Sequence, residues 1–111
     1  LVETVQSINI PVIASGGMHS GVDAAKALTL GASLVGMAHP VLSAATKGSK
    51  EVEKTLKIIL EELKNAMFLV GAESIPALKK ASAVITGKTA DWLTMRGFQP
   101  ELYARRGIAG R

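Results

Sequence analysis

The sequence predicts an α/β fold with a parallel sheet, because two short apolar segments are separated by one segment of helical character. Residues 12–14 and 34–38 are apolar and short, as expected of strands that are buried on both faces of a parallel sheet. Residues 21–30 lie between them and are expected to form a helix. Since parallel neighbours require such a crossover connection, the fold class follows from this segment alone.

The start and the end of this first helix are both marked in the sequence. Ser20 is followed three residues later by Asp23, a spacing that is typical of a capping box at a helix start. Gly31 supplies the residue after the helix, where a left-handed backbone costs glycine little. The segment is therefore predicted to be a strand–helix–strand unit with defined helix ends.

Further helices are predicted along the rest of the chain, over residues 41–45, 50–70, 76–80 and 89–96. Pro40 is tolerated in the first turn of the first of these, and Ser49 is the expected cap of the long one. Gly71 and Gly97 are expected to end the second and the last. The long helix has one apolar stripe, made of Val52, Leu56, Ile59, Leu60, Leu63, Met67 and Val70.

Both predicted strands end in small residues, which allow a ligand to approach the backbone closely. The carboxyl ends of parallel strands meet at one edge of a sheet, so the free N–H groups of both ends form a cup suited to a phosphate. The predicted cofactor-binding residues are Ser15, Gly16, Gly17, Gly36, Met37 and Ala38. The competing interpretation is that these glycines only permit tight turns.

This arrangement is typical of the C-terminal portion of a (β/α)8 barrel, the TIM barrel. In such barrels a phosphate commonly lies between the loops after strands 7 and 8, beside a short extra helix. Residues 39–46 are the candidate for that helix. The prediction is therefore strands 7 and 8 with their helices and a C-terminal helical extension. A complete barrel needs roughly 250 residues, so this chain of 111 residues is expected to be part of a larger protein.

The two histidines are weaker candidates for a functional role. His19 lies in the predicted phosphate loop. It could act there as a hydrogen-bond donor or weak acid–base group, or it could be a turn residue that faces solvent. His39 follows the second strand. It either contacts a ligand there or has a structural or solvent-facing role. The sequence has no metal-ligand cluster, no Ser-His-Asp set and no paired carboxylates near the cup. No catalytic residue and no metal-binding residue is therefore predicted.

The composition argues against several classes of function, membrane-spanning and nucleic-acid-binding proteins among them. The chain has no cysteine, which suits a reducing cytosol, and no apolar run approaches the roughly 20 residues needed to cross a bilayer. A cytoplasmic protein without a membrane partner is expected. The net charge of +4 comes mostly from four arginines after residue 92, and aromatic residues are few, so nucleic-acid binding is not expected.

Two regions are predicted. Residues 1–97 are expected to form the C-terminal part of a phosphate-binding (β/α)8 barrel, and residues 98–111 a basic C-terminal tail that is expected to be flexible. Contact of Arg105, Arg106 and Arg111 with an acidic partner or another subunit is the alternative for this tail.

The second half of the chain resembles one flavin-dependent family in particular. The glycine-rich segments at residues 14–17 and 31–38 resemble flavin-dependent barrels in general. The segments that narrow the resemblance are 62–72, which contains Ala-Met-Phe-Leu-Val-Gly-Ala, then 78–81, 84–88 with Val-Ile-Thr-Gly, and 92–93. Together they are similar to the C-terminal end of type 2 isopentenyl diphosphate isomerases. The resemblance covers nearly the whole chain and weakens after Gly97.

This resemblance implies an enzyme that interconverts isopentenyl and dimethylallyl diphosphate with reduced FMN, NADPH to reduce the flavin, and Mg²⁺. It implies that the six cup residues hold the FMN phosphate through backbone amides, whereas the contacts to substrate, metal and flavin ring lie upstream. A homo-oligomer is expected, and the 111-residue chain alone is predicted to be inactive. The chain departs from the family at Met18-His19-Ser20, where a basic residue, commonly arginine, usually follows an aliphatic one.

Two alternatives stay open. The first is another FMN-dependent barrel of the 2-hydroxy-acid oxidase or glutamate synthase type, which shares the glycine turns but should lack the run at residues 66–72. The second is a non-catalytic, self-associating half-barrel, because open strand edges invite pairing.

Overall fold

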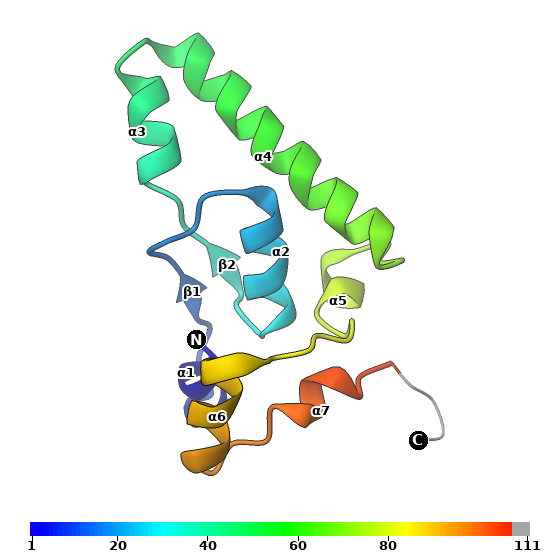
Figure 1. The fold of residues 1–111 in the computed structure, drawn as a ribbon. Coiled ribbons are helices and arrows are strands. Elements are labelled where there is room, and N and C mark those ends of the chain that lie inside the picture. The colour runs from blue at the N-terminus through cyan, green and yellow to red at the C-terminus, as the bar shows by residue number, and fades with distance from the viewer. Residues whose placement is uncertain (108–111) are drawn as a thin grey trace.

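The computed structural model describes residues 1–107. Their elements are α1 (Val2–Ser7), β1 (Ile13–Ala14), α2 (Gly21–Thr29), β2 (Leu34–Val35), α3 (His39–Ala45), α4 (Ser49–Leu69), α5 (Ile75–Leu78), α6 (Gly87–Met95) and α7 (Glu101–Ala104). The predicted α/β class is confirmed, with two parallel strands and mostly helices. Figure 1 shows α4 running past α3 and α2, and α6 beside α1 at the other end of the molecule.

The two strands pair in parallel, and α2 makes the crossover between them. Ile13 lies opposite Leu34 and Ala14 opposite Val35. Beyond these pairs, the Ser33 N–H donates to Val12 O and the Gly36 N–H donates to Ala14 O, both at 2.8 Å. Both strands are shorter than the apolar segments that predicted them.

One prediction about the strands is wrong for the chain as described. Ala14 is buried, but Ile13 is 63% exposed and Leu34 is 61% exposed, so the strands are not covered on both faces. The physical reason is that helices of residues 1–107 cover one face, and no further element of these residues lies over the other. Both outer strand edges are also unpaired within this region. Such open edges and faces are expected of one sector of a barrel, in which neighbouring strands close the sheet.

Helix α2 begins and ends as its sequence predicts. The Ser20 side chain accepts a hydrogen bond from the Asp23 N–H at 3.2 Å, which confirms the predicted cap. Gly31 has φ +113°, and its N–H donates to Leu28 O. The helix buries alanines against the sheet, where Ala27 packs with Ala14 and Ala32.

Helices α2 and α4 approach each other closely at Gly21. A Cβ at this position would lie 2.2 Å from Ile59 O, 2.4 Å from Leu63 N and 2.6 Å from Glu62 Cβ. These are backbone and near-backbone atoms, so the two helices have no room for a side chain here. Farther along, Ala25 and Leu28 of α2 are buried together with residues after α4, with Leu63, Ala66 and Met67 of α4 packed against them. Because glycine lacks Cβ, α4 lies directly on the start of α2.

The later helices differ from their predictions mainly at their starts. Ser49 is the first residue of α4 rather than its cap, because Gly48 occupies the N-cap position and no side chain caps this end. Helix α3 begins at His39, before Pro40, and α6 begins at Gly87, earlier than expected. The predicted ends of α4 and α6 before glycine are confirmed.

Residues 98–107 pack against the rest of the chain instead of extending from it. Tyr103 of α7 is 3% exposed and is buried with Val2 and Leu93. The Arg106 guanidinium lies over the Tyr103 ring at 4.2 Å and donates to the carbonyl groups of Thr29 and Lys79. The flexibility of residues 98–111 stays a prediction, and Arg111 lies outside the described residues. Tertiary contacts of one aromatic and one arginine side chain hold the segment.

Helices α1 and α6 are joined by a charged contact. The Arg96 Nε donates to Glu3 Oε1 at 2.7 Å, and this hydrogen bond holds the pKa of the Glu3 carboxyl below its usual range. The contact therefore acts at neutral pH and is lost only as the pH falls through that lowered pKa. No helix within residues 1–107 combines the length and the apolar character needed to span a membrane.

Gly21→Ala is expected to destabilise the chain by about 1–3 kcal/mol, because the added methyl group meets the backbone of α4. Chemical denaturation followed by circular dichroism measures the change. Val22→Ala alters an exposed neighbour on the same helix and is the matched control, with an expected change below about 0.5 kcal/mol. Equal effects of the two substitutions would contradict the close approach of the helices.

Candidate functional site

The loops after β1 and β2 meet at the carboxyl edge of the sheet, as the parallel topology requires. The first loop starts with Ser15 and the second with Gly36, and both leave the sheet on the side toward α3 (Figure 1). A Cβ on Gly36 would lie 3.1 Å from Ser15 Oγ and 3.3 Å from Ser15 Cβ. The structure thus brings the two predicted segments, 15–17 and 36–38, together.

Gly16 and Gly17 give the first loop a backbone shape that other residues rarely adopt. Their φ angles are +85° and +73°. Apart from the adjoining residues of the chain, no atom lies within 4 Å of the position where either residue would carry a Cβ. The loop is therefore open to solvent at these two positions, and its backbone is accessible to a ligand.

Five of the six predicted residues have amide groups free for a ligand. Among residues 1–107, the N–H groups of these five donate to no protein acceptor: Ser15, Gly16, Gly17, Met37 and Ala38. Gly36 is the exception, because its N–H donates to Ala14 O in the sheet. The prediction that the Gly36 amide contacts the ligand does not fit this hydrogen bond. Gly36 instead keeps the space beside the Ser15 hydroxyl free of a side chain.

Helix α3 follows the second loop directly and corresponds to the short helix expected at residues 39–46. Ala38 occupies its N-cap position, and its carbonyl accepts from Leu42 N at 2.9 Å. No side chain caps this end of the helix. The backbone N–H groups at the helix start are therefore left without a side-chain partner from within the described chain.

His19 and His39 lie next to each other beside these loops. Their ring centroids are 6.0 Å apart and their planes are inclined by 80°, an edge-to-face arrangement. The contact between the two histidines was not predicted from the sequence. The signal was present, because each histidine follows a parallel strand and therefore belongs to the same edge of the sheet.

Asp23 holds the first loop against the start of α2. The backbone N–H of His19 donates to Asp23 Oδ2 at 3.0 Å, and this hydrogen bond holds the pKa of the Asp23 carboxyl below its usual range. The carboxylate is therefore charged at neutral pH, and the contact is lost only as the pH falls through the lowered pKa. Together with the Ser20 cap, it fixes where the loop joins the helix.

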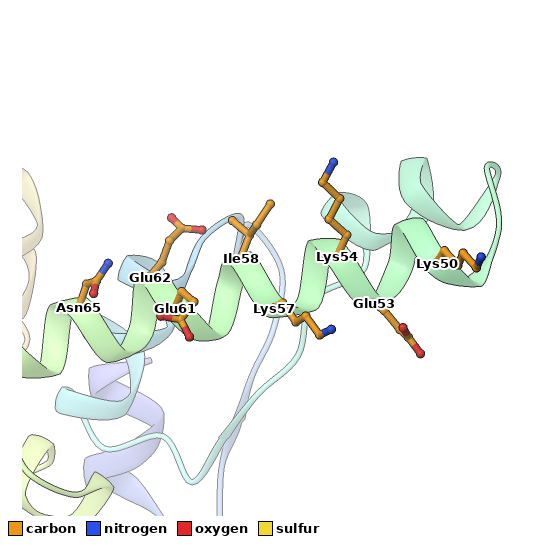
Figure 2. Close-up of a pocket in the computed structure, with 8 residues that line it drawn as sticks. All are labelled: Lys50, Glu53, Lys54, Lys57, Ile58, Glu61, Glu62 and Asn65. Carbon is orange, nitrogen blue, oxygen red and sulfur yellow. The ribbon is translucent and has the colours of Figure 1, made fainter.

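The outer surface of α4 offers no comparable site. Figure 2 shows a surface whose lining side chains all project from α4: Lys50, Glu53, Lys54, Lys57, Ile58, Glu61, Glu62 and Asn65. No second element faces these side chains across the surface, which carries charges of both signs. Residues 1–107 contain no group of three or more His, Asp or Glu side chains placed to hold a metal ion.

Sequence comparisons relate this chain to flavin-dependent proteins. The profile of the FMN-dependent dehydrogenase family matches residues 1–85. The isopentenyl-diphosphate delta-isomerase of Methanothermobacter thermautotrophicus is 55% identical over 105 residues, which cover 95% of this chain and 30% of that protein. The isopentenyl-diphosphate delta-isomerase of Pyrococcus furiosus is 54% identical over 97 residues, which cover 86% of this chain and 25% of that protein. The chain therefore spans less than a third of the length of these curated relatives.

Solved structures of mandelate oxidase share the fold. One, with 3,3-difluoro-2-hydroxy-3-phenylpropionic acid, has a TM-score of 0.68 and 39% identity over 74% of this chain and 26% of that chain. A mandelate oxidase mutant with (S)-mandelic acid has a TM-score of 0.71 and 37% identity over 78% of this chain and 27% of that chain. These structures are TIM-barrel enzymes, which confirms the predicted fold as part of such a barrel.

Ser20→Ala is expected to lower the free energy of unfolding by about 1 kcal/mol, because the Asp23 N–H loses its acceptor at the helix start. Ser49→Ala is the control, since Ser49 is the first residue of α4 and its side chain makes no capping hydrogen bond. Thermal denaturation of both variants measures the difference. A loss from Ser49→Ala as large as that from Ser20→Ala would contradict the assignment of the caps.

Proposed function

This chain belongs to the FMN-dependent dehydrogenase family, and from that premise we propose that the loops after β1 and β2 bind the phosphate group of FMN. The observation that carries the proposal is the set of free amide groups at residues 15–17 and 37–38. These groups belong to two adjacent loops at one edge of the sheet. Phosphate oxygens accept such hydrogen bonds well, because each oxygen carries part of a negative charge.

The residues present fit a phosphate group. Gly16 and Gly17 leave open space where side chains would stand, and Gly36 leaves the Ser15 hydroxyl uncovered. The Ser15 hydroxyl can therefore donate to a phosphate oxygen beside the amides of its own loop. The amides of Met37 and Ala38 approach from the second loop. A phosphate held from two loops has its position fixed by the pairing of the strands.

We propose that the whole protein interconverts isopentenyl and dimethylallyl diphosphate. Identity to the isomerase of M. thermautotrophicus is 55% over 95% of the chain, against 39% over 74% for mandelate oxidase. A match of 105 residues also extends past residue 85, where the match to the family profile ends. That later part carries α6 and α7, so the isomerase relatives account for segments that the profile does not cover. Likeness to oxidase structures supports the alternative of a 2-hydroxy-acid oxidase.

In either reaction this chain would hold one end of the flavin. Bound reduced FMN would supply the proton transfer that the isomerase resemblance implies. Ser15, Gly16 and Gly17 would fix the phosphate and thereby set the distance between the flavin ring and the sheet edge. No residue of 1–107 is assigned to the reacting atoms.

NADPH, Mg²⁺ and the diphosphate substrate are proposals for the whole protein. The described residues hold no cluster suited to a metal ion, so no Mg²⁺ ligand is assigned among them. A homo-oligomer and a cytoplasmic location are proposed from the family resemblance and the composition. The 111-residue chain alone is proposed to lack isomerase activity, because the substrate contacts implied by the resemblance lie outside it.

The chain is expected to bind FMN with saturation and to bind riboflavin, which lacks the phosphate, far more weakly. Quenching of flavin fluorescence on titration with the folded chain measures both affinities. Equal binding of the two flavins would contradict a phosphate site. A concentration-dependent dimer without flavin affinity would favour the self-association alternative, for which the exposed Ile13 and Leu34 of the open strands offer apolar surface.

Gly16→Ala is expected to weaken FMN binding by about tenfold, the effect of losing one hydrogen bond to the phosphate. Gly97→Ala is the matched control, because Gly16 and Gly97 have φ angles of +85° and +84° and both have open space around them. The two variants should therefore lose similar stability, and only Gly16→Ala should lose flavin affinity. Unchanged FMN affinity in a folded Gly16→Ala variant would count against the first loop as the phosphate site.

A further inference from the structure

One side chain of α2 holds the downstream end of the loop that follows β1. The backbone N–H of His19 donates to Asp23 Oδ2 at 3.0 Å. Among residues 1–107, no other hydrogen bond involves the backbone of residues 15–19. The His19 amide is therefore committed to Asp23, whereas the amides of residues 15–17 are left for a ligand. A carboxylate on the helix thus determines where the loop ends.

We propose that Asp23 is a positioning residue for the FMN phosphate, because its carboxylate holds the backbone of the loop so that the free amides of residues 15–17 face one ligand. Asp23 acts through the His19 amide and does not itself contact the phosphate. This inference rests on the phosphate site proposed above. A second anchor of the loop is the side chain of Met18, which packs against the buried alanines of β1 and α2. That apolar contact leaves the backbone groups of the loop without a partner, so Asp23 supplies the hydrogen bond.

The loop needs such a hold because two of its residues are glycines. Gly16 and Gly17 have φ angles of +85° and +73°, and neither has a neighbour outside the adjoining chain that would confine it. Glycine loses more conformational freedom than any other residue when its backbone is fixed. A loop that is already held before the ligand arrives leaves less of this entropy to be lost on binding, so FMN binds more tightly.

The charge of Asp23 by itself opposes the binding of an anion. A carboxylate and a phosphate repel each other, so the charge alone would weaken FMN binding. Lys26, one turn farther along α2, interacts electrostatically with the carboxylate and offsets part of that charge. The hydrogen bond to the His19 backbone acts in the opposite direction, because it keeps the loop in place. Loss of the carboxylate therefore changes FMN affinity in two opposite directions, and a test has to remove the charge without removing the acceptor.

The experiment is a titration of the full chain with FMN and with riboflavin, in which Asp23→Asn and Asp23→Ala are compared. Both variants lose the negative charge, so the difference between them reports the hydrogen bond alone. The asparagine carbonyl can still accept from the His19 N–H, whereas alanine offers no acceptor. The alanine variant should bind FMN about fivefold more weakly than the asparagine variant, the effect of one hydrogen bond. Riboflavin should bind the two variants alike.

Ser74→Ala is the matched control for a general loss of stability. The side chain of Ser74 accepts a hydrogen bond from the Ala77 N–H at 3.2 Å and caps α5 in this way. The substitution removes one hydrogen bond at a helix start that belongs to neither loop, so FMN affinity should stay unchanged. A loss of FMN affinity from Ser74→Ala as large as that from Asp23→Ala would mean that any local destabilisation weakens binding, and it would overturn the positioning role.

Amide hydrogen exchange at His19 measures the contact directly and needs no flavin. The His19 amide should exchange more slowly in the unaltered chain and in Asp23→Asn than in Asp23→Ala. If the alanine variant does not fold, Asp23→Ser takes its place. The serine oxygen lies one bond closer to the helix than the carboxylate oxygens do, so this variant should also lose the contact and bind FMN more weakly than Asp23→Asn.

The outcomes separate the positioning role from the phosphate site. Equal FMN affinity of the folded asparagine and alanine variants overturns the positioning role while leaving the phosphate site in place. A loss for riboflavin that equals the loss for FMN also overturns it, because the loop would then act on a part of the flavin other than the phosphate. If the unaltered chain binds FMN and riboflavin equally, the phosphate site itself fails, and the positioning role with it.

Discussion

The hydrogen bonds from Ser33 to Val12 and from Gly36 to Ala14 hold β1 and β2 in parallel register, and the remaining features of the site depend on that register. Parallel pairing directs the carboxyl ends of both strands to one edge. The free amides of the two loops and the pair of imidazoles all follow from this placement. A shift of one residue would turn Ala14 from the covered face to the open one and separate Ser15 from Gly36.

Small residues decide how closely the covering helices approach this sheet. Gly21 lets α4 lie against the backbone at the start of α2, and the buried alanines of α2 bring that helix close to the strands. The opposite face of the strands keeps Ile13 and Leu34 exposed. This combination of one closely packed face and one open apolar face fits a sector of a barrel. It also agrees with relatives of which this chain spans less than a third.

The comparisons support a fold that is shared by flavin-dependent enzymes more strongly than they support any one reaction. The match to the isomerase of M. thermautotrophicus covers 95% of this chain and so includes β1, α2 and β2, and one mandelate oxidase structure covers 74% of the chain. The segment after residue 85 separates the two alternatives, because the match to the M. thermautotrophicus isomerase extends into it. In that segment Tyr103 is buried with Val2 and Leu93, and Arg106 donates to the Thr29 carbonyl, so both side chains join α7 to the rest of the described chain.

The sequence by itself determined the features that depend on neighbouring residues. The Ser20 cap, the glycine after α2 and the open turn at Gly16 and Gly17 follow from local hydrogen bonding and backbone conformation. The parallel direction of the strands follows from the helix that connects two short apolar segments. Tertiary structure decided the rest, because those features join residues that are distant along the chain. The sheet uses the Gly36 amide, His19 meets His39, and Tyr103 with Arg106 holds a segment predicted to be flexible. Each of these contacts exists only after the two strands have paired and the helices have packed on them.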